Sequence, residues 1–511
     1  MGQGLVTPPP SGASHKWGLT PEQWSETQGI VVSGFGHLPW AEALFLRLDR
    51  PGGAWLNTLR TLAPITDATG KTDRASAIAF TWTGLERLGL DKETLETFSL
   101  PFREGMHQED RRRRLGDQDK TGMLIEGGPL WSGNTPATVD GSVVLSTRET
   151  VHALLLLYDK DEGTLDSWAA QVCAALQKER VTRVHRLRLD LRLDENEIAR
   201  EHFGFADGIS QPMPYLARPD GTPVEKDPWH GVPVGEILMG YRNAHDEDAP
   251  GPVVRKAGNP ATEGSGLWPD GAPEGFLNLG LNGTYMVVRE LRQDVAAFWT
   301  SLDKGAAAVG EPKVDADWLA ARIIGRDRDG NLLCPSGTLA PKDGRPDDAF
   351  GFLRTDPHGL GCPLGSHVRR ANPRDGLAPD EASRQALLDS ANNHRILRRG
   401  RKYGPTIQDP RRDDGEDRGL LFICLNTDIA RQFEFIQQTW LLNRNFATLF
   451  DETDPLLGPK GPLTIPKDPL RRIVEVETYV RMAGGEYFFL PSLPALAYLA
   501  RLPGQADPPA P

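Results

Sequence analysis

Two distant segments of the chain repeat one pattern, an apolar strand followed by an acidic turn and then a helix. Residues 151–158 (VHALLLLY) predict a buried strand, and residues 164–177 follow an Asp-Lys-Asp turn with helical spacing. Residues 419–426 (GLLFICLN) lead through a Thr-Asp pair to helical residues 429–442. A strand–helix unit that occurs twice predicts a duplicated α+β fold rather than one long parallel sheet.

The beginnings of the two halves also correspond. The β-branched run from Gly29 predicts a strand at the start of the first half, although residues 38–48 mix helical and strand spacing. Residues 283–288 (GTYMVV) predict a strand that is followed by a helix over 289–302. Residues 214–277 are rich in Pro, Gly, Asp and Glu and separate the two halves.

These patterns divide the chain into five parts. We expect a flexible amino-terminal segment, a first α+β domain, a long irregular connection, a second α+β domain and a flexible tail. Their bounds are 1–24, 25–215, 216–280, 281–502 and 503–511. The arginine-rich stretch within 108–127 is expected to be a solvated loop.

Composition excludes several classes of protein. The 58 Lys and Arg against 70 Asp and Glu give a net charge of −12, and without a basic stripe we expect no nucleic-acid partner. No apolar run approaches the roughly 18 residues of a membrane span, so no membrane association is expected. The sequence also lacks a standard export signal, and its four widely spaced cysteines suggest a reducing, cytoplasmic location.

Common catalytic signatures are absent, and two segments remain as candidates. No HExxH, GxSxG, phosphate-binding loop or well-placed GxGxxG occurs. In 204–212 (GFADGISQP), Asp207 lies between Gly204 and Gly208, whose conformational freedom permits close approach to a ligand. In 362–374 (CPLGSHVRRANPR), His367 precedes three arginines, and more arginines follow in RILRRGRKYG. Each segment alone is more typical of a turn or a solvated face.

Together, the segments resemble the dye-decolorising peroxidase family. GFADGISQP contains the GxxDG signature of that family, and residues 367–374 (HVRRANPR) are similar to its haem-ligand segment. Further similar segments occur in the same order over some 400 residues, at 29–38, 102–106 with 115–117, and 419–438. The length and long loops are more similar to the larger members.

The resemblance implies the fold, the cofactor and the site. The fold is two ferredoxin-like α+β domains with packed antiparallel sheets, as in dimeric α+β barrels, and haem b is held mainly by the second domain. His367 matches the axial iron ligand, Asp207 the distal acid and Arg398 the distal arginine. Arg398 is preferred over Arg399 because it lies six residues before Gly404.

Other cofactor contacts are less specific. Asp428 matches an acid that accepts the second ring N–H of His367, and it is equally suited to capping the following helix. Gly208 lies beside the distal acid. The haem propionates require cations, for which the sequence offers Arg369, Arg370 and Arg374. The chain departs from some short bacterial members at Gly400, where those carry an asparagine, so the distal site has two polar residues.

Three functions are compatible with these residues. The resemblance implies a haem peroxidase that reduces hydrogen peroxide and oxidises bulky aromatic, phenolic or dye-like donors, as a monomer or homo-oligomer. A second candidate is a haem-binding or iron-releasing protein, similar to a deferrochelatase, with incidental peroxidase activity. A third is a haem-free scaffold that binds a divalent cation through Asp207 and Glu201. An acid beside an arginine favours the peroxidase, because one can move a proton and the other stabilise charge.

Overall fold

The computed structural model describes residues 17–70, 72–117, 128–135, 147–216, 227–342, 344–467 and 471–503. Eight strands form its framework. They are β1 (Trp40–Leu48), β2 (Arg74–Phe80), β5 (Ala153–Asp159), β6 (Val181–Asp190), β11 (Thr284–Gln293), β15 (Arg401–Tyr403), β16 (Gly419–Asn426) and β19 (Val480–Leu490).

Each half of the chain forms an antiparallel sheet with the same strand order. In the first half β1 lies between β5 and β6, and β2 pairs with β5; in the second half β11 lies between β16 and β19, and β15 pairs with β16. Numbered along the chain within each half, both sheets read 4-1-3-2. The α+β fold of two ferredoxin-like units is thereby confirmed.

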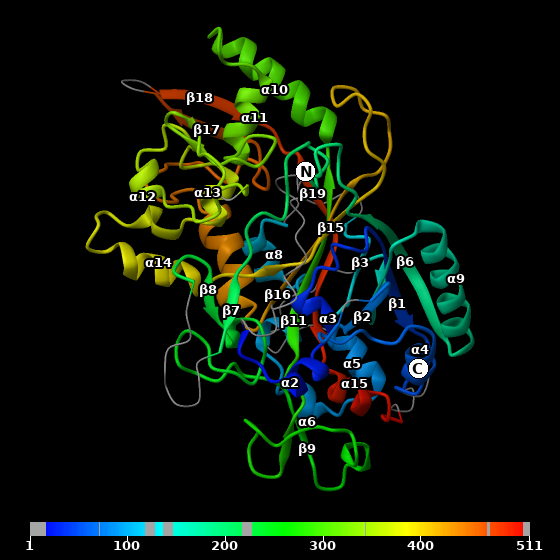
Figure 1. Ribbon diagram of the computed structural model, residues 1–511. Helices are drawn as coiled ribbons and strands as arrows, with labels where there is room; N and C mark the ends of the chain where they lie inside the picture. Colours follow the sequence, from blue (N-terminus) through cyan, green and yellow to red (C-terminus); the bar gives the residue numbers. More distant parts are fainter. Residues whose placement is uncertain are drawn as a thin grey trace.

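Two short seams join the sheets into a closed barrel (Figure 1). Phe489 of β19 pairs with Phe80 of β2, and Tyr403 of β15 pairs with Leu189 of β6. A two-residue strand, β14 (Leu397–Arg398), pairs with the end of β16 at Cys424 and Leu425, whereas β15 pairs with its beginning. The barrel is therefore closed by one paired residue of β2 and two paired residues of β6.

Alternation along the strands separates two apolar clusters. Ala41, Ala43 and Phe45 of β1 face the barrel interior, where residues of both halves meet. Leu44 and Leu46 belong to the other cluster, which lies under the helices of the first half. The period of two residues therefore gives each sheet a face inside the barrel and a face under helices.

Helices cover the outer faces. In Figure 1, α9 lies over the first sheet, and α12 to α14 lie on the side of the second half. The helices are α2 (Pro21–Glu26), α3 (Gly29–Val32), α4 (Trp55–Leu62), α5 (Trp82–Leu88), α6 (Lys92–Leu95), α7 (Leu100–Glu104), α8 (Glu109–Leu115), α9 (Glu162–Lys178), α10 (Val295–Val309), α11 (Ala316–Ile324), α12 (Phe352–Thr355), α13 (His367–Ala371), α14 (Arg384–Asn392) and α15 (Leu493–Leu499), with π-helical η5 (Ala430–Glu434) and η6 (Ile436–Leu441) and the 3-10 turns η2 (Val234–Glu236), η3 (Pro260–Thr262) and η4 (Arg374–Leu377).

Short strand pairs complete the loops. They are β3 (Trp131–Ser132) with β4 (Glu149–Thr150), β7 (Met213–Tyr215) with β8 (Gly231–Pro233), β9 (Val253–Arg255) with β10 (Phe276–Asn278), β12 (Leu333–Cys334) with β13 (Gly337–Thr338), and β17 (Gly461–Pro466) with β18 (Arg471–Val476). The connection between the halves contains β8, which pairs with β7, and the pair of β9 with β10, and is otherwise irregular.

Two sequence predictions of secondary structure are wrong. The run from Gly29 is the short helix α3 rather than a strand, and its carbonyls at Ile30 and Val31 accept hydrogen bonds from Arg399. Residues 289–293 continue β11 instead of starting a helix, which begins at Val295 with Asp294 as its cap. Alternate outward side chains of β11 line a cavity, so local helical spacing was outweighed by tertiary packing.

The arginine-rich stretch is not simply a solvated loop. Its described part contains α8, and Arg111 of this helix is buried between Glu104 and Glu434, at 2.5 Å from a carboxylate oxygen of each. Residues 118–127 lie outside the described residues. Of the amino-terminal segment that we expect to be flexible, residues 1–16 lie outside the described residues, and Trp17 and Trp24 are buried with ring centroids 5.5 Å apart. The tail from 504 lies outside the described residues.

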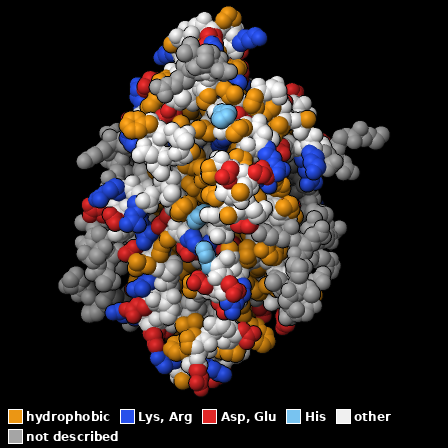
Figure 2. Space-filling model, turned by 90° about the vertical axis from the view of Figure 1, so that its left-hand side faces the viewer, with side chains coloured by type: hydrophobic (Ala, Val, Ile, Leu, Met, Phe, Trp, Pro, Cys, Tyr) orange, Lys and Arg blue, Asp and Glu red, His pale blue; other side chains and the backbone are white. Residues whose placement is uncertain are grey.

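Charged groups are interspersed on the face that carries the second-half helices (Figure 2). Acidic and basic side chains alternate there without a continuous basic stripe. Within the described part of the chain, no helix is both long and apolar enough to cross a bilayer.

Buried histidines predict acid sensitivity of the fold. Burial lowers the pKa of His107 and His202 to about 4, and each ring bonds a backbone carbonyl, of Gly485 and Tyr403 respectively. The unfolded chain binds their protons near the ordinary histidine pKa of about 6.5, so their stabilisation is complete above that pH and lost towards pH 4. We expect each to contribute at most about 3 kcal/mol to this loss.

Urea unfolding of wild type and His202→Gln between pH 4.5 and 7.5 checks this expectation. Glutamine can still donate to the Tyr403 carbonyl but does not titrate. The free energy of unfolding should therefore fall less steeply with acid in the variant, because the variant takes up about one proton fewer on unfolding. Equal slopes for the two proteins would contradict the assignment of His202 as an acid-sensitive group.

Candidate active site

A cavity of about 280 Å³ lies against the outer face of the second sheet. Leu291, Phe422 and Met482 come from β11, β16 and β19, and Ile436 and Trp440 come from η6. Three sequence candidates from different parts of the chain, Asp207, His367 and Arg398, also line it, and so does Gly208. The cavity therefore combines an apolar wall with an acid, an imidazole and a guanidinium.

Asp207 and Arg398 contact each other directly. Nη1 of Arg398 lies 3.3 Å from Oδ1 of Asp207, and both side chains are about one third exposed. Nη2 of Arg398 donates to the carbonyl oxygen of Ser210 at 3.1 Å. The arginine is thus held by the same loop that carries the acid.

The backbone around this pair is fixed from both sides. Gln211 accepts the N–H of Arg398 at 3.0 Å and donates to its carbonyl at 3.3 Å. Gly208 has φ +78, which favours glycine, and no atom lies within 4 Å of the place where a Cβ would stand. The position beside Asp207 is therefore open towards the cavity.

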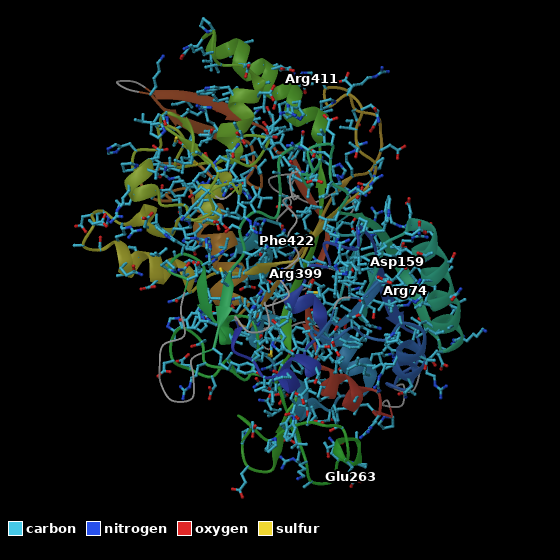
Figure 3. All side chains as sticks on the ribbon, viewed as in Figure 1. Arg74, Asp159, Glu263, Arg399, Arg411 and Phe422 are labelled. Carbon is cyan, nitrogen blue, oxygen red and sulfur yellow. The ribbon has the colours of Figure 1, made fainter. Side chains whose placement is uncertain are left out.

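The structure distinguishes Arg398 from Arg399. Arg399 donates from Nε to Ile30 at 2.7 Å and from Nη2 to Val31 at 2.6 Å, and it does not line the cavity. The backbone N–H of Arg399 donates to the carbonyl of Ile423, the residue after Phe422; Figure 3 labels Arg399 and Phe422. Arg399 thus joins β14 to α3, whereas the side chain of Arg398 lines the cavity.

Gly400 has a packing explanation. A Cβ at this position would stand 2.5 Å from the carbonyl oxygen of Leu421. An asparagine would require β14 and β16 to move apart, so this chain has no third polar side chain there.

His367 is paired with a carboxylate that the sequence analysis missed. Its Nδ1 lies 2.9 Å from Oδ2 of Asp454, which is fully buried and also accepts the N–H groups of Leu456 and Leu457. Burial opposes a charged ring, but the Asp454 carboxylate outweighs it and leaves the pKa of His367 raised. The ring nitrogen left for a metal is Nε2.

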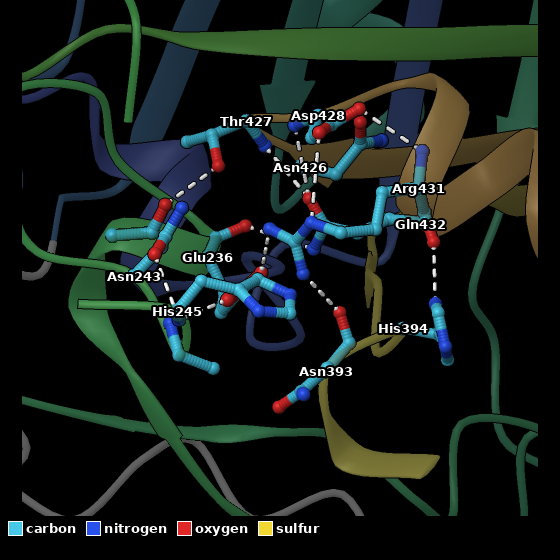
Figure 4. Close-up of polar contacts among 12 residues, drawn as sticks. Glu236, Asn243, His245, Asn393, His394, Asn426, Thr427, Asp428, Arg431 and Gln432 are labelled. Carbon is cyan, nitrogen blue, oxygen red and sulfur yellow. Dashed lines mark hydrogen bonds and ion pairs between the residues drawn. The ribbon is translucent and has the colours of Figure 1, made fainter. Parts of the chain in front are cut away.

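Asp428 does not contact His367, which corrects the expectation from the sequence. Its Oδ1 accepts the backbone N–H of Arg431 at 2.9 Å, as a helix cap does, and it is absent from the cavity lining (Figure 4). Arg431 is also paired with the buried Glu236 at 2.7 Å. Asp428 therefore belongs to a structural network at the end of β16.

Two of the three arginines after His367 are also directed elsewhere. Arg369 donates to the carbonyl of Cys362, and Arg370 to those of Trp440 and Glu452, at 2.7–2.8 Å. Neither lines the cavity, which corrects their expected role as cofactor contacts. Arg374 does line it, and its Nε is buried with no hydrogen-bond partner among the described residues.

Arg326 and Arg395 are cavity arginines that the sequence analysis did not assign. Nη2 of Arg326 is buried without a partner among the described residues. Burial lowers the pKa of Arg326 and Arg374 to about 10 and that of Arg395 well below its ordinary value. Buried guanidinium groups with free N–H donors form a site that favours an anion.

A second carboxylate lies close to Asp207 in the loop. Glu201 accepts the N–H groups of Phe203 and Phe205 at 2.8 and 2.9 Å and a hydrogen bond from Gln293. Burial raises its pKa. The described residues contain no group of three His, Cys, Asp or Glu side chains that could hold a metal ion, which disfavours the divalent-cation reading.

These residues fit a haem. His367 offers Nε2 to an iron while Nδ1 is held by Asp454, and the apolar wall suits a macrocycle. The unpartnered donors of Arg326 and Arg374 suit carboxylate groups.

Known proteins similar to the chain include several dye-decolorising peroxidases and, over a shorter stretch of 228 residues at 28% identity, a deferrochelatase of Yersinia pestis. No protein-family model matches the chain. The multifunctional dye peroxidase DyP2 of Amycolatopsis is 31% identical over 370 residues, which cover 69% of this chain and 72% of that protein. A dye-decolorising peroxidase of Mycena epipterygia is 27% identical over 469 residues, covering 83% and 75%. The crystal structure of a DyP-type peroxidase from Anabaena has a TM-score of 0.71 at 24% identity, covering 98% and 99%, and shares the fold.

The fold and these relatives define a peroxidase, an oxidoreductase that uses peroxide. The chain belongs to the dye-decolorising peroxidase family.

Proposed function

We propose that the chain binds haem b in this cavity, reduces hydrogen peroxide to water and oxidises bulky aromatic, phenolic or dye-like donors. The observation that carries the proposal is the meeting of Asp207, Arg398 and His367 at one cavity from positions up to 191 residues apart. A related structure, a dye-decolorising peroxidase solved in complex with 2,6-dimethoxyphenol, supports an aromatic donor. Bound haem would supply the iron and the two electrons that reduce the peroxide. Two one-electron donors would then replace those electrons.

His367 would hold the cofactor through Nε2. Its Nδ1–H donates to Asp454, which makes the imidazole a more basic ligand and fixes its orientation. Arg326, Arg374 and Arg395 would hold the haem carboxylates, because their buried positive charges have few counter-ions. The chain thus has separate groups for the iron and for the propionates.

Asp207 and Arg398 would act on the peroxide. The Asp207 carboxylate accepts the proton of the inner peroxide oxygen and returns it to the outer oxygen, which departs as water. The Arg398 guanidinium stabilises the negative charge that develops on the departing oxygen. Ser210 and Gln211 hold the arginine in place during this step.

A haem carrier remains the alternative on the same fold. A carrier needs the His367 side of the cavity but neither a proton acceptor nor a neighbouring guanidinium. An absorbance spectrum separates the two functions: a peroxidase shows a Soret band that shifts on addition of peroxide, whereas a carrier shows the band without a rapid shift.

Asp207→Asn tests the role of the acid. The amide keeps the shape of the side chain but cannot accept the peroxide proton, so we expect the peroxide reaction to slow by about 10²- to 10⁴-fold. Stopped-flow measurement of the peroxide step alone, without a donor, gives this rate for both proteins.

Asp428→Asn is a matched control, because Asp428 carries the same carboxylate outside the cavity. Equal rates for wild type and Asp207→Asn would remove Asp207 from the mechanism and leave its loop a structural role.

A further inference from the structure

Arg395 occupies a position between the cavity and a histidine of the connection. Its side chain is 6% exposed, lines the cavity and bonds Ser210 Oγ through Nη2 at 3.3 Å. Its Nη1 lies 3.2 Å from Nδ1 of His230. The guanidinium therefore links the GFADGIS loop to a residue of the connection between the domains.

The hydrogen bonds of His230 require one neutral tautomer. A guanidinium can only donate, so Nδ1 of His230 must accept from Arg395. Its Nε2 then carries the proton and donates to Oδ1 of Asp348 at 3.2 Å. The ring is only 12% exposed, and Asp227 fixes its backbone by accepting the N–H of His230 at 2.7 Å.

Ser210 connects this pair to the proposed catalytic groups. Its hydroxyl accepts from Arg395, and its carbonyl accepts from Nη2 of Arg398. Arg398 in turn contacts Asp207. A continuous series of polar contacts thus runs from the connection to the residues that would act on peroxide.

We propose that His230 is a positioning residue for the peroxide step, which as a neutral acceptor holds Arg395 against Ser210 and thereby fixes the loop that carries Asp207. This inference rests on the proposed function. It assigns to the connection between the domains a role in the reaction that is exerted through Arg395, one of the residues proposed to hold the haem carboxylates.

Charged groups surround His230. Asp227 and Asp348 face the ring from two loops, and the guanidinium groups of Arg326, Arg374 and Arg395 lie in the same neighbourhood. Among these charges, Nδ1 of His230 is the ring atom that accepts from Nη1 of Arg395.

Two substitutions of His230 separate positioning from mere packing. His230→Phe fills the space but cannot accept from Arg395. His230→Gln can accept through Oε1 and donate to Asp348 through Nε2. His245→Gln is the control, because His245 is an exposed histidine of the same connection.

Hydrogen exchange of the peptide covering residues 205–212, measured on haem-loaded protein at neutral pH, reads the loop directly. We expect exchange about tenfold faster in His230→Phe, with a peroxide step about tenfold slower. His230→Gln and the His245→Gln control should both match wild type.

Unchanged exchange and rate in His230→Phe would overturn the inference, and so would a Gln variant that behaves like Phe at neutral pH. The proposed function fails differently. If wild type binds haem but does not react with peroxide, while exchange still responds to His230, the positioning role stands and the peroxidase mechanism does not.

Discussion

His367→Ala is expected to fold and to lose its haem. The His367 imidazole lines the cavity and is hydrogen-bonded to the buried Asp454 carboxylate, which suits it to bind the iron. In the alanine variant, haem would contact only the apolar wall and the arginines. We expect haem affinity to fall at least about 100-fold. Titration of the purified apoprotein with haem, followed by the Soret band, measures the loss, and circular dichroism verifies the fold.

The cavity contains a second histidine that serves as the control. His394 also lines it, but its Nδ1 bonds the Arg431 carbonyl at 2.6 Å (Figure 4). Its ring stacks on Phe435 with centroids 3.7 Å apart. His394→Gln should keep most of the haem affinity. If His394→Gln loses haem and His367→Ala retains it, the ligand assignment is reversed.

Comparing two carboxylates tests the correction at Asp428. Asp454→Asn removes the charge that His367 Nδ1 faces, and we expect haem to bind about 10- to 100-fold more weakly. Asp428→Asn changes only the cap of the helix after β16 and should leave haem affinity within about twofold. Free imidazole added to His367→Ala should restore part of the spectrum, because the vacated space can accept it.

Much of the fold could be predicted because its signals are local. The strand at 419–426 has its predicted bounds, since an unbroken apolar run between a glycine and an acidic turn admits few alternatives. The run from Gly29 has similar composition but forms α3. Its carbonyls accept from Arg399, and a Cβ at Gly29 would stand 2.5 Å from the Asp67 carbonyl. Those contacts come from distant residues, which periodicity cannot detect.

The site shows the same division. Asp207, His367 and Arg398 could be chosen because each lies in a motif of the family. Asp454 follows no motif and lies 87 residues after His367, so only the folded chain shows their contact. Arg369 and Arg370 are adjacent to His367 in sequence, but the helical rotation of α13 directs them to backbone carbonyls. Proximity along the chain was therefore a poor guide to proximity at the cavity.

Arg398→Leu is expected to slow the peroxide step without preventing haem binding. The guanidinium lies beside Asp207 and is the proposed cation for the charge on the departing oxygen. Loss of one such electrostatic group typically costs about 2 to 4 kcal/mol of barrier, or roughly 30- to 1000-fold in rate. Stopped-flow rates are divided by haem occupancy, so that a change in binding is not mistaken for a change in chemistry.

Arg399→Leu is the matched control, since it removes the same group from the next residue. Arg399 donates to the carbonyls of Ile30 and Val31, so leucine leaves these backbone groups without their partner. We expect a lower melting temperature and a nearly unchanged rate per bound haem. Arg398→Lys should fall between wild type and leucine, because an ammonium keeps the charge but cannot contact Asp207 and Ser210 with the same fork. If Arg399→Leu is slow and Arg398→Leu reacts at the wild-type rate, the catalytic assignment passes to Arg399, and the contact between Arg398 and Asp207 has only a structural role.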